Sequence, residues 1–158
     1  VRSFSEKKVE QEKIDSILRA GQVAPTACNK QPQKIYVLQS AEALKTLQKC
    51  KSSHFGETIA FLICYDASEC WTREYDGKSS GDINTSIVAT HMMLEAWELG
   101  IGSTWIMHFI PEAIKKEFDL PDSVVPVCIL VMGYPAKEAV PSVQHAKKKE
   151  LKEMVTVL

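Results

Sequence analysis

The sequence lacks the motifs that would assign a chemistry at once. It contains no C-x-x-C pair and no H-E-x-x-H, G-x-S-x-G or G-x-x-x-x-G-K motif. These absences argue against a structural zinc site, a zinc protease, a serine hydrolase with a nucleophile elbow and a P-loop protein. The four histidines are isolated from one another and from any cysteine pair, so we expect no metal site.

A strong excess of one charge is also missing. The chain has 19 basic and 20 acidic residues and a formal net charge of -1, whereas binding to nucleic acid usually requires a basic stripe. No apolar run approaches the length of a membrane helix, and no signal peptide is visible. The five cysteines are odd in number and fit reduced thiols. We therefore expect a cytoplasmic protein that binds neither nucleic acid nor membrane.

What is present is an ordinary globular mixture, with 45% hydrophobic and 25% charged residues in 158. This length suits one domain, residues 1–158, whose core needs no disulfides. Hydrophobic periodicity predicts helices that alternate with apolar strands. The predicted helices are Val9–Gly21, Ala41–Cys50, Ile83–Leu99 and Pro111–Phe118, and the predicted strands are Lys34–Gln39, Thr58–Tyr65 and Val124–Met132. Between Gly100 and Phe109 we expect a glycine-rich turn and a short apolar segment.

The longest predicted helix, Ile83–Leu99, is apolar around much of its circumference. Ile83, Ile87 and Leu94 lie on one side, and further apolar residues spread over the others. Such a helix must be covered over most of its surface. We expect its own sheet and a second subunit to cover it, which predicts a homodimer. The polar stretch before it, Asp66–Gly81, exceeds usual loop lengths and is either mobile or functional.

The loop Ala24–Pro32 joins the first helix to the first strand and is the main candidate for a binding site. Pro25 and Pro32 keep the residues before them out of the helical region, so the loop is stiff and presents backbone groups. Thr26, Asn29 and Gln31 add side-chain donors and acceptors. A plain helix-to-strand connection explains the same composition equally well.

The remaining features fit a flat cofactor with a phosphate tail. An isoalloxazine ring needs hydrogen-bond partners at its pyrimidine edge, a positive charge near N1 and an apolar wall. The loop, Arg2 and Trp105 offer these three, and the lysines at 147–149 offer a phosphate site. Taken singly, Trp105 fits a core position and the lysines fit a solvated face better.

Three motifs together resemble the nitroreductase-like family of FMN-dependent oxidoreductases in its small single-domain form. They are A-P-T-A-C-N-K-Q-P (Ala24–Pro32), the long stretch Asp82–Ile106, and V-M-G-Y-P (Val131–Pro135). The resemblance covers nearly the whole chain. It implies an α+β fold, a three-layer sandwich with a central mixed β-sheet flanked by helices, which forms an intertwined homodimer with two FMN sites at the interface.

The resemblance also implies which residues bind the cofactor. The FMN-binding set is Arg2, Pro25, Thr26, Ala27, Asn29, Trp105, Ile106, Met107, His108, Gly133, Lys147 and Lys148. By the family's pattern, the residues from Pro25 to Asn29 come from one subunit and Arg2 lies near the pyrimidine edge of the ring. The last two lysines, Lys148 more securely, match a basic residue at the phosphate.

The implied activity is an FMN-dependent NAD(P)H oxidoreductase that reduces nitro compounds, quinones or similar acceptors by ping-pong hydride transfer. No side chain needs to act as a nucleophile, since the flavin carries the hydride. The sequence departs from the family at Gln33, where tryptophan is frequent, and lacks the first arginine and serine of the opening motif. These departures leave open a non-catalytic flavin-binding or flavin-storage module, and a structural dimer without cofactor.

Overall fold

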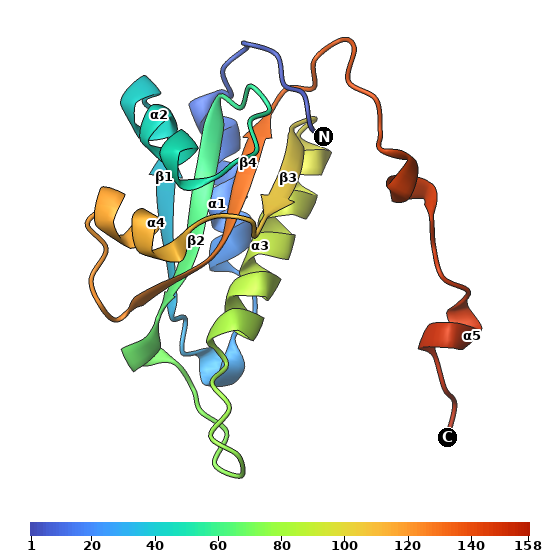
Figure 1. Cartoon of the computed structure of the whole chain (residues 1–158). Coiled ribbons are helices and arrows are strands. Elements are labelled where there is room, and N and C mark those ends of the chain that lie inside the picture. The colour runs from blue at the N-terminus through green and yellow to red at the C-terminus, as the bar shows by residue number, and fades with distance from the viewer.

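One four-stranded sheet organises the chain. The computed structural model describes residues 1–158, and its strands lie in the order β1-β2-β4-β3 (Figure 1). Their bounds are β1 Gln33–Leu38, β2 Ile59–Asp66, β3 Gly102–Ile106 and β4 Val124–Gly133. The strand β3 takes the place of the turn and short apolar segment that the sequence suggested between Gly100 and Phe109.

The expectation of a mixed sheet is wrong for this chain, because all three strand pairs are antiparallel. The helices between the strands do not show whether neighbouring strands run parallel or antiparallel, since a helix can connect either kind of pair. The strands β2 and β3 do run in the same direction. However, β4 lies between them, so no two parallel strands are neighbours.

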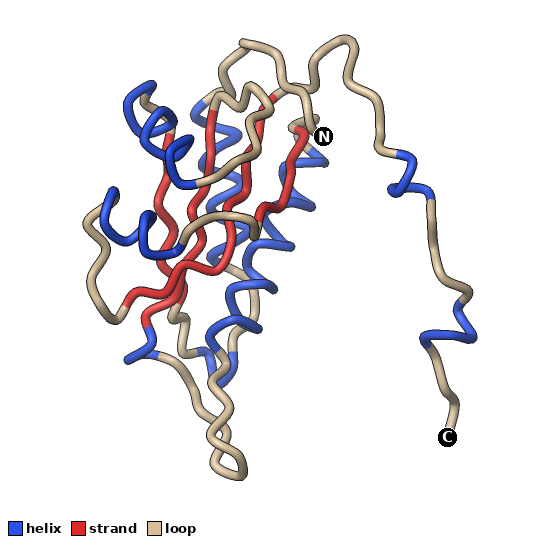
Figure 2. The backbone as a smooth tube through the Cα atoms, in the orientation of Figure 1, coloured by secondary structure: helices blue, strands red, loops and turns tan.

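Helices cover both faces of the sheet and make three layers (Figure 2). The helices α1 (Gln11–Gln22) and α3 (Gly81–Glu98) lie on one face, and α2 (Ala41–Cys50) and α4 (Pro111–Glu117) lie on the other. Side chains of β2 alternate between the two resulting cores: Ile59, Phe61 and Ile63 face α1 and α3, whereas Ala60, Leu62 and Cys64 face α2 and α4. The α+β sandwich expected from the sequence is confirmed.

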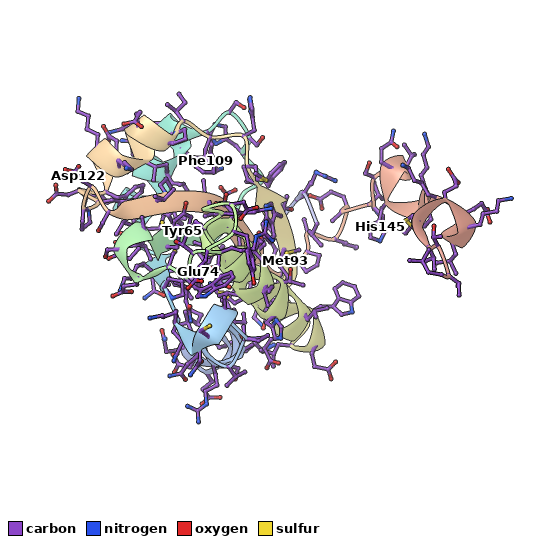
Figure 3. All side chains as sticks on the ribbon, turned by 90° about the horizontal axis from the view of Figure 1, so that it is seen from below. Tyr65, Glu74, Met93, Phe109, Asp122 and His145 are labelled. Carbon is purple, nitrogen blue, oxygen red and sulfur yellow. The ribbon has the colours of Figure 1, made fainter.

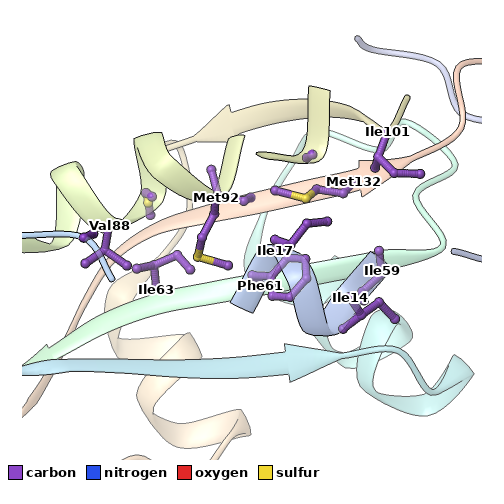
Figure 4. Packing of buried hydrophobic residues seen from close by; sticks show 14 residues of the cluster. Ile14, Ile17, Ile59, Phe61, Ile63, Val88, Met92, Ile101 and Met132 are labelled. Atoms are coloured by element: carbon purple, nitrogen blue, oxygen red, sulfur yellow. The ribbon is translucent and has the colours of Figure 1, made fainter. Parts of the chain in front are cut away.

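The core on the α1/α3 face is closely packed (Figure 4). Phe61, Ile17 and Met92 have at most 1% of their surface exposed. Each such side chain contributes roughly 1.5–3 kcal/mol through removal of its apolar surface from water. This core fixes α3 against the sheet, and α3 in turn positions the segments at both of its ends.

The predicted helix caps are partly correct. Ser40 caps α2, and its Oγ accepts a hydrogen bond from the Ala43 N–H at 3.1 Å. Asp82 does not cap α3, because the helix already begins at Gly81 and Asp82 lies in its first turn. A Cβ at Gly81 would lie 2.6 Å from the Tyr65 ring. Glycine therefore allows the helix to start directly against β2.

The stretch between β2 and α3 is a projecting hairpin-like loop that follows a short helix, η2 (Ala67–Glu69). Thr72 pairs with Ser79, and the Arg73 guanidinium forms a two-pronged ion pair with Asp76. Gly77 turns the loop with a positive φ of 71°. The loop extends beyond the sheet at the end where α3 begins (Figure 1). It is thus locally ordered by its own contacts.

Beyond β4 the chain leaves the body as an extended arm. Every residue from Val140 to Leu158 is exposed, and we call this segment the C-terminal arm. It contains two short helices, η3 (Val143–Ala146) and α5 (Leu151–Met154). Figure 3 shows His145 well away from the sandwich. None of the helices in the structure is long and apolar enough to span a membrane.

Candidate functional site

The loop Ala24–Pro32 has an unusual backbone. Cys28, Asn29 and Gln31 all adopt positive φ angles, of 50°, 51° and 49°. Each costs of order 1–3 kcal/mol for a residue with a side chain, somewhat less for asparagine. The strain is concentrated here, since the rest of the chain has only one other positive-φ residue that is not glycine, Asp119. Strain of this kind requires specific contacts to hold the loop in shape.

Two hydrogen bonds supply those contacts. The Gln31 N–H donates to Thr26 Oγ1 at 3.0 Å, which closes the loop. The Ala27 N–H donates to Asn84 Oδ1, also at 3.0 Å, which ties the loop to the first turn of α3. The Asn84 amide is 2% exposed and donates in turn to Ser80 Oγ at 3.0 Å. Asn84 was not foreseen as part of the site; an amide among apolar positions at a helix start was the available signal.

The outer edge of the loop faces solvent. Pro25, Cys28 and Asn29 are exposed. The backbone N–H of Ala27 is already engaged, whereas the Asn29 side-chain amide forms no hydrogen bond in the chain. An amide offers a donor and an acceptor side by side. This edge can therefore recognise a planar ligand with a complementary pair.

A second group of predicted site residues lies at the other end of α3. The Val1 amine donates to the Ser103 carbonyl at 3.0 Å, and the Val1 side chain fills the space beside Gly102. Arg2 follows, exposed and without an ion pair in the chain. Gly133 pairs with Gly102 across the sheet. The start of the chain is thus held along β3, with the Arg2 charge free.

Glycine at 133 lets Phe4 pack closely, because a Cβ there would lie 3.2 Å from the Phe4 ring. Phe4 also pairs its backbone with Pro135. These contacts fix the path of the chain from Arg2 to the body. The structure therefore brings Arg2, Gly133 and the start of β3 together.

The segment Trp105–His108 continues along β3 from this group. Trp105 is half-buried against the α1/α3 core, whereas Ile106 is 5% exposed and belongs to the α2/α4 core. Met107 and His108 face solvent, and His108 Nδ1 lies 3.1 Å from Ser52 Oγ. A cavity of about 430 Å³ adjoins His108. Ile106 can thus contribute only its backbone to a ligand site, while Trp105, Met107 and His108 can contribute side chains.

The loop and the group around Arg2, Gly133 and the start of β3 do not meet within one chain. The strand β3 runs back alongside α3 and carries Trp105 part of the way toward the loop (Figure 1). The loop is tied to the first turn of α3, and β3 begins just after the last turn. A helix of 18 residues is about 27 Å long. Lys147 and Lys148 are separate from both groups, because they lie in the C-terminal arm, where Lys148 Nζ donates to the His145 carbonyl. One chain alone therefore holds parts of the expected site in three places.

The face of α3 directed away from the sheet remains uncovered. Ile83, Leu94 and Trp97 are 52%, 65% and 72% exposed. An open groove of about 460 Å³ runs between Asp82 and His91 on the same helix. The inner face, with Val88, Met92 and Ala96, is buried as the sequence predicts. Apolar surface of this kind on a long helix marks an interaction site.

The layers define an α+β protein in which the strained loop lies at one end of the longest helix and the start of the chain lies at the other. The sequence model of the nitroreductase family matches this chain over residues 1–58 and 47–134. The chain belongs to the nitroreductase family.

Solved structures and one curated relative agree with this assignment. A nitroreductase family protein from Clostridium difficile 630 is 42% identical, with a TM-score of 0.92 over 98% of this chain and 90% of that one. An FMN-dependent nitroreductase from C. difficile R20291 is 26% identical, with a TM-score of 0.75 over 92% and 88% of the two chains. An FMN reductase [NAD(P)H] of Bacillus subtilis is 25% identical over 86% of this chain and 62% of its own length.

Proposed function

We propose that this chain is an FMN-dependent NAD(P)H oxidoreductase that acts as a homodimer. The names of its relatives support the cofactor and the electron donor. The observation that carries the proposal is the separation of free ligand-binding groups to the two ends of α3, on either side of an uncovered apolar face. A site for FMN is complete only when two copies combine these ends.

The chemistry of the free groups fits the cofactor. The Asn29 amide and the Arg2 guanidinium are exposed and form no hydrogen bond or ion pair in the chain. Asn29 would pair with the pyrimidine edge of FMN, and Arg2 would place positive charge near N1 and the C2 oxygen. Trp105 would provide an apolar wall. Lys147 and Lys148 would approach the phosphate, as point charges without the bidentate geometry of arginine.

The dimer is proposed as an isologous pair in which the α3 helices pack against each other in opposite directions. This arrangement covers Ile83, Leu94 and Trp97 of both copies and places the loop of one copy near Arg2 of the other. The C-terminal arm, which has no contact with its own body, would cross to the partner. That crossing would bring the arm's lysines to a site they cannot reach within one chain.

When bound, FMN supplies hydride transfer, from NAD(P)H in one half-reaction and to the acceptor in the next. Arg2 stabilises negative charge at the pyrimidine edge of the ring, and Asn29 fixes the orientation of that edge. Solvent or a weakly placed polar group supplies the protons for the acceptor. The exposure of Met107 and His108 leaves room for flat acceptors. We propose quinones and nitro compounds as the acceptor class and a ping-pong cycle.

The visible spectrum of the purified protein is the test. We expect an oxidised flavin spectrum, as isolated or after reconstitution with FMN, that bleaches on anaerobic addition of NADH or NADPH and returns when a quinone is added. A flavin spectrum that persists with both donors would support a flavin-binding module without turnover. A protein that binds no FMN would contradict the proposal. Asn29→Ala and Arg2→Ala should each weaken FMN binding without loss of folding.

A further inference from the structure

A buried ion pair lies outside the residues assigned to the site. Lys51 Nζ is 2.6 Å from Glu57 Oε1, and the two side chains are 0% and 3% exposed. Lys51 Nζ also donates to the Ser53 carbonyl, and Glu57 Oε2 accepts from the Phe55 N–H at 3.0 Å. These bonds close residues 51–57 into a compact loop, which we call the clamp loop. All other ion pairs of the chain involve partly or largely exposed side chains.

The clamp loop contacts the segment that carries Arg2. The Phe4 N–H donates to the Phe55 carbonyl at 3.0 Å. A Cβ at Gly56, which has a positive φ of 74°, would lie 3.4 Å from the Phe4 carbonyl oxygen. Phe4 is two residues after Arg2 and packs against Gly133. The position of Arg2 therefore depends on the shape of the clamp loop.

The same loop contacts the segment that follows β3. The backbone of Lys51 pairs with Phe109, and the Ile110 N–H donates to the Cys50 carbonyl at 2.9 Å. Ser52 lies within hydrogen-bond distance of His108. One short loop thus joins two segments, residues 1–5 and 107–110, that are about a hundred positions apart in the sequence. Both segments contribute to the proposed FMN site.

Stability alone does not account for a buried charge pair at this place. The cost of removing both charges from water often equals their attraction, so an apolar pair of similar volume stabilises a fold as well or better. The ion pair instead makes the loop geometry specific, since the ammonium and the carboxylate form strong hydrogen bonds only with partners at certain positions. Here those partners are the backbone of Ser53 and Phe55, which set the path of the loop.

We propose that Lys51 and Glu57 are positioning residues that hold Arg2 and the Met107–His108 segment in register with each other at the FMN ring. The inference rests on the proposed function for its ligand. Its structural part, the coupling of the two segments through the clamp loop, can be measured without FMN.

The test uses the full-length variant Lys51→Met/Glu57→Met, which replaces the ion pair with apolar side chains of similar volume. The matched control is Lys34→Met/Glu69→Met, which removes an exposed ion pair of 2.9 Å elsewhere. FMN affinity is measured by quenching of FMN fluorescence, and folding by thermal unfolding of the apoprotein. We expect the first variant to unfold within a few degrees of the wild type and to bind FMN about 10-fold more weakly, and the control to bind FMN unchanged.

A double-mutant cycle with Arg2→Ala separates positioning from a general structural effect. If the ion pair acts through Arg2, its removal in the Arg2→Ala background should change FMN affinity by less than about 2-fold. The full 10-fold loss in that background would overturn the positioning role, and so would unchanged affinity in the wild-type background. If the wild type binds no FMN, the proposed function fails instead.

Amide hydrogen exchange decides the structural part in either case. In the Lys51→Met/Glu57→Met variant, exchange at Phe4 and Ile110 should accelerate about 10-fold while α3 core amides such as Met92 keep their wild-type rates. Equal rates at Phe4 and Ile110 in variant and wild type would contradict the coupling. If the double variant does not fold, Glu57→Asp is used for the same measurement, since it keeps both charges and moves the carboxylate away from the Phe55 N–H by one methylene.

Discussion

The sandwich and the C-terminal arm contain similar kinds of residues but bury them very differently. The sandwich places its apolar side chains in two cores on either side of one sheet. The arm carries Val143, Leu151 and Met154, and all three are more than 60% exposed. The outer face of α3, with Leu94 and Trp97, resembles the arm in this respect. An apolar side chain is therefore buried in this protein only where its own chain offers a facing surface, and the arm and the outer face of α3 have none within the chain.

The largest expected effect comes from the centre of the sandwich. Phe61 lies on β2, is fully buried and packs in the α1/α3 core. We expect Phe61→Ala to lower the free energy of unfolding by about 3–5 kcal/mol, through lost transfer energy and the cavity left behind. Urea denaturation measures this loss. Val143→Ala in the arm is the comparison, and a loss there as large as in the core would contradict the difference between the two regions.

A smaller effect is expected where the sandwich holds the strained loop. Asn84→Ala removes the acceptor of the Ala27 N–H and a hydrogen bond to Ser80. We expect a loss of about 1–3 kcal/mol in unfolding free energy, because the half-buried Ala27 N–H loses its acceptor and the buried Ser80 hydroxyl loses its donor. FMN affinity should fall as the loop relaxes. Asn84→Asp, which keeps the acceptor, should retain most of the affinity measured by flavin fluorescence.

The strained loop also shows how far the sequence alone could lead. Apolar residues predicted every helix and strand of the sandwich except β3, through helical or alternating spacing in some elements and through continuous apolar runs in β2 and β4. The strand β3 was missed because Gly100 and Gly102 are typical of a turn. The loop was recognised as a binding candidate, yet its left-handed backbone at Cys28 and Gln31 was not predicted.

Long-range contacts explain what the sequence could not predict about the site. The bond from Ala27 to Asn84 and the clamp loop each join residues more than fifty positions apart. The antiparallel order of the sheet has the same origin, since β4 pairs with β2 across more than fifty intervening residues. The two ends of α3 could be assigned to one ligand only by resemblance, and the structure places them about 27 Å apart.

Acid should weaken the sandwich through Glu57. Burial tends to raise the pKa of this carboxyl, but hydrogen bonds from Lys51 and from the Phe55 N–H outweigh burial and hold the pKa below its usual value of 4.5. A carboxyl whose pKa is lower in the folded state stabilises the fold above pH 4.5, and this stabilisation is lost as the pH falls toward the folded-state pKa. We expect unfolding free energy to decrease over this range.

Glu57→Gln should reduce that pH dependence, and it should also lower stability at neutral pH because it leaves the Lys51 charge buried without a counter-charge. Urea denaturation between pH 3 and 7 measures both effects. The control variant is Glu69→Gln, which removes the carboxylate of the exposed Lys34–Glu69 ion pair. If the unfolding free energy of Glu57→Gln changes with pH as steeply as that of the wild type, other groups cause the acid sensitivity. The arm contains no buried carboxyl, so its removal should not alter the slope.

The smallest effect on the stability of a single chain is expected from truncation after Ala139, which removes the whole C-terminal arm. Nothing in the arm packs against its own body, so unfolding free energy should change by less than about 0.5 kcal/mol. The measurement is made in a Trp97→Glu background, where the charge on the outer face of α3 should prevent association of two copies.

Without the Trp97→Glu substitution, truncation should lower the dimer fraction in sedimentation velocity, because the arm's apolar residues would lose the partner surface. A truncation that destabilises the single chain as much as Asn84→Ala would mean that the arm packs on its own body. If instead truncation leaves the dimer intact and the single chain unchanged, the arm contributes to neither, and the outer face of α3 alone carries the association.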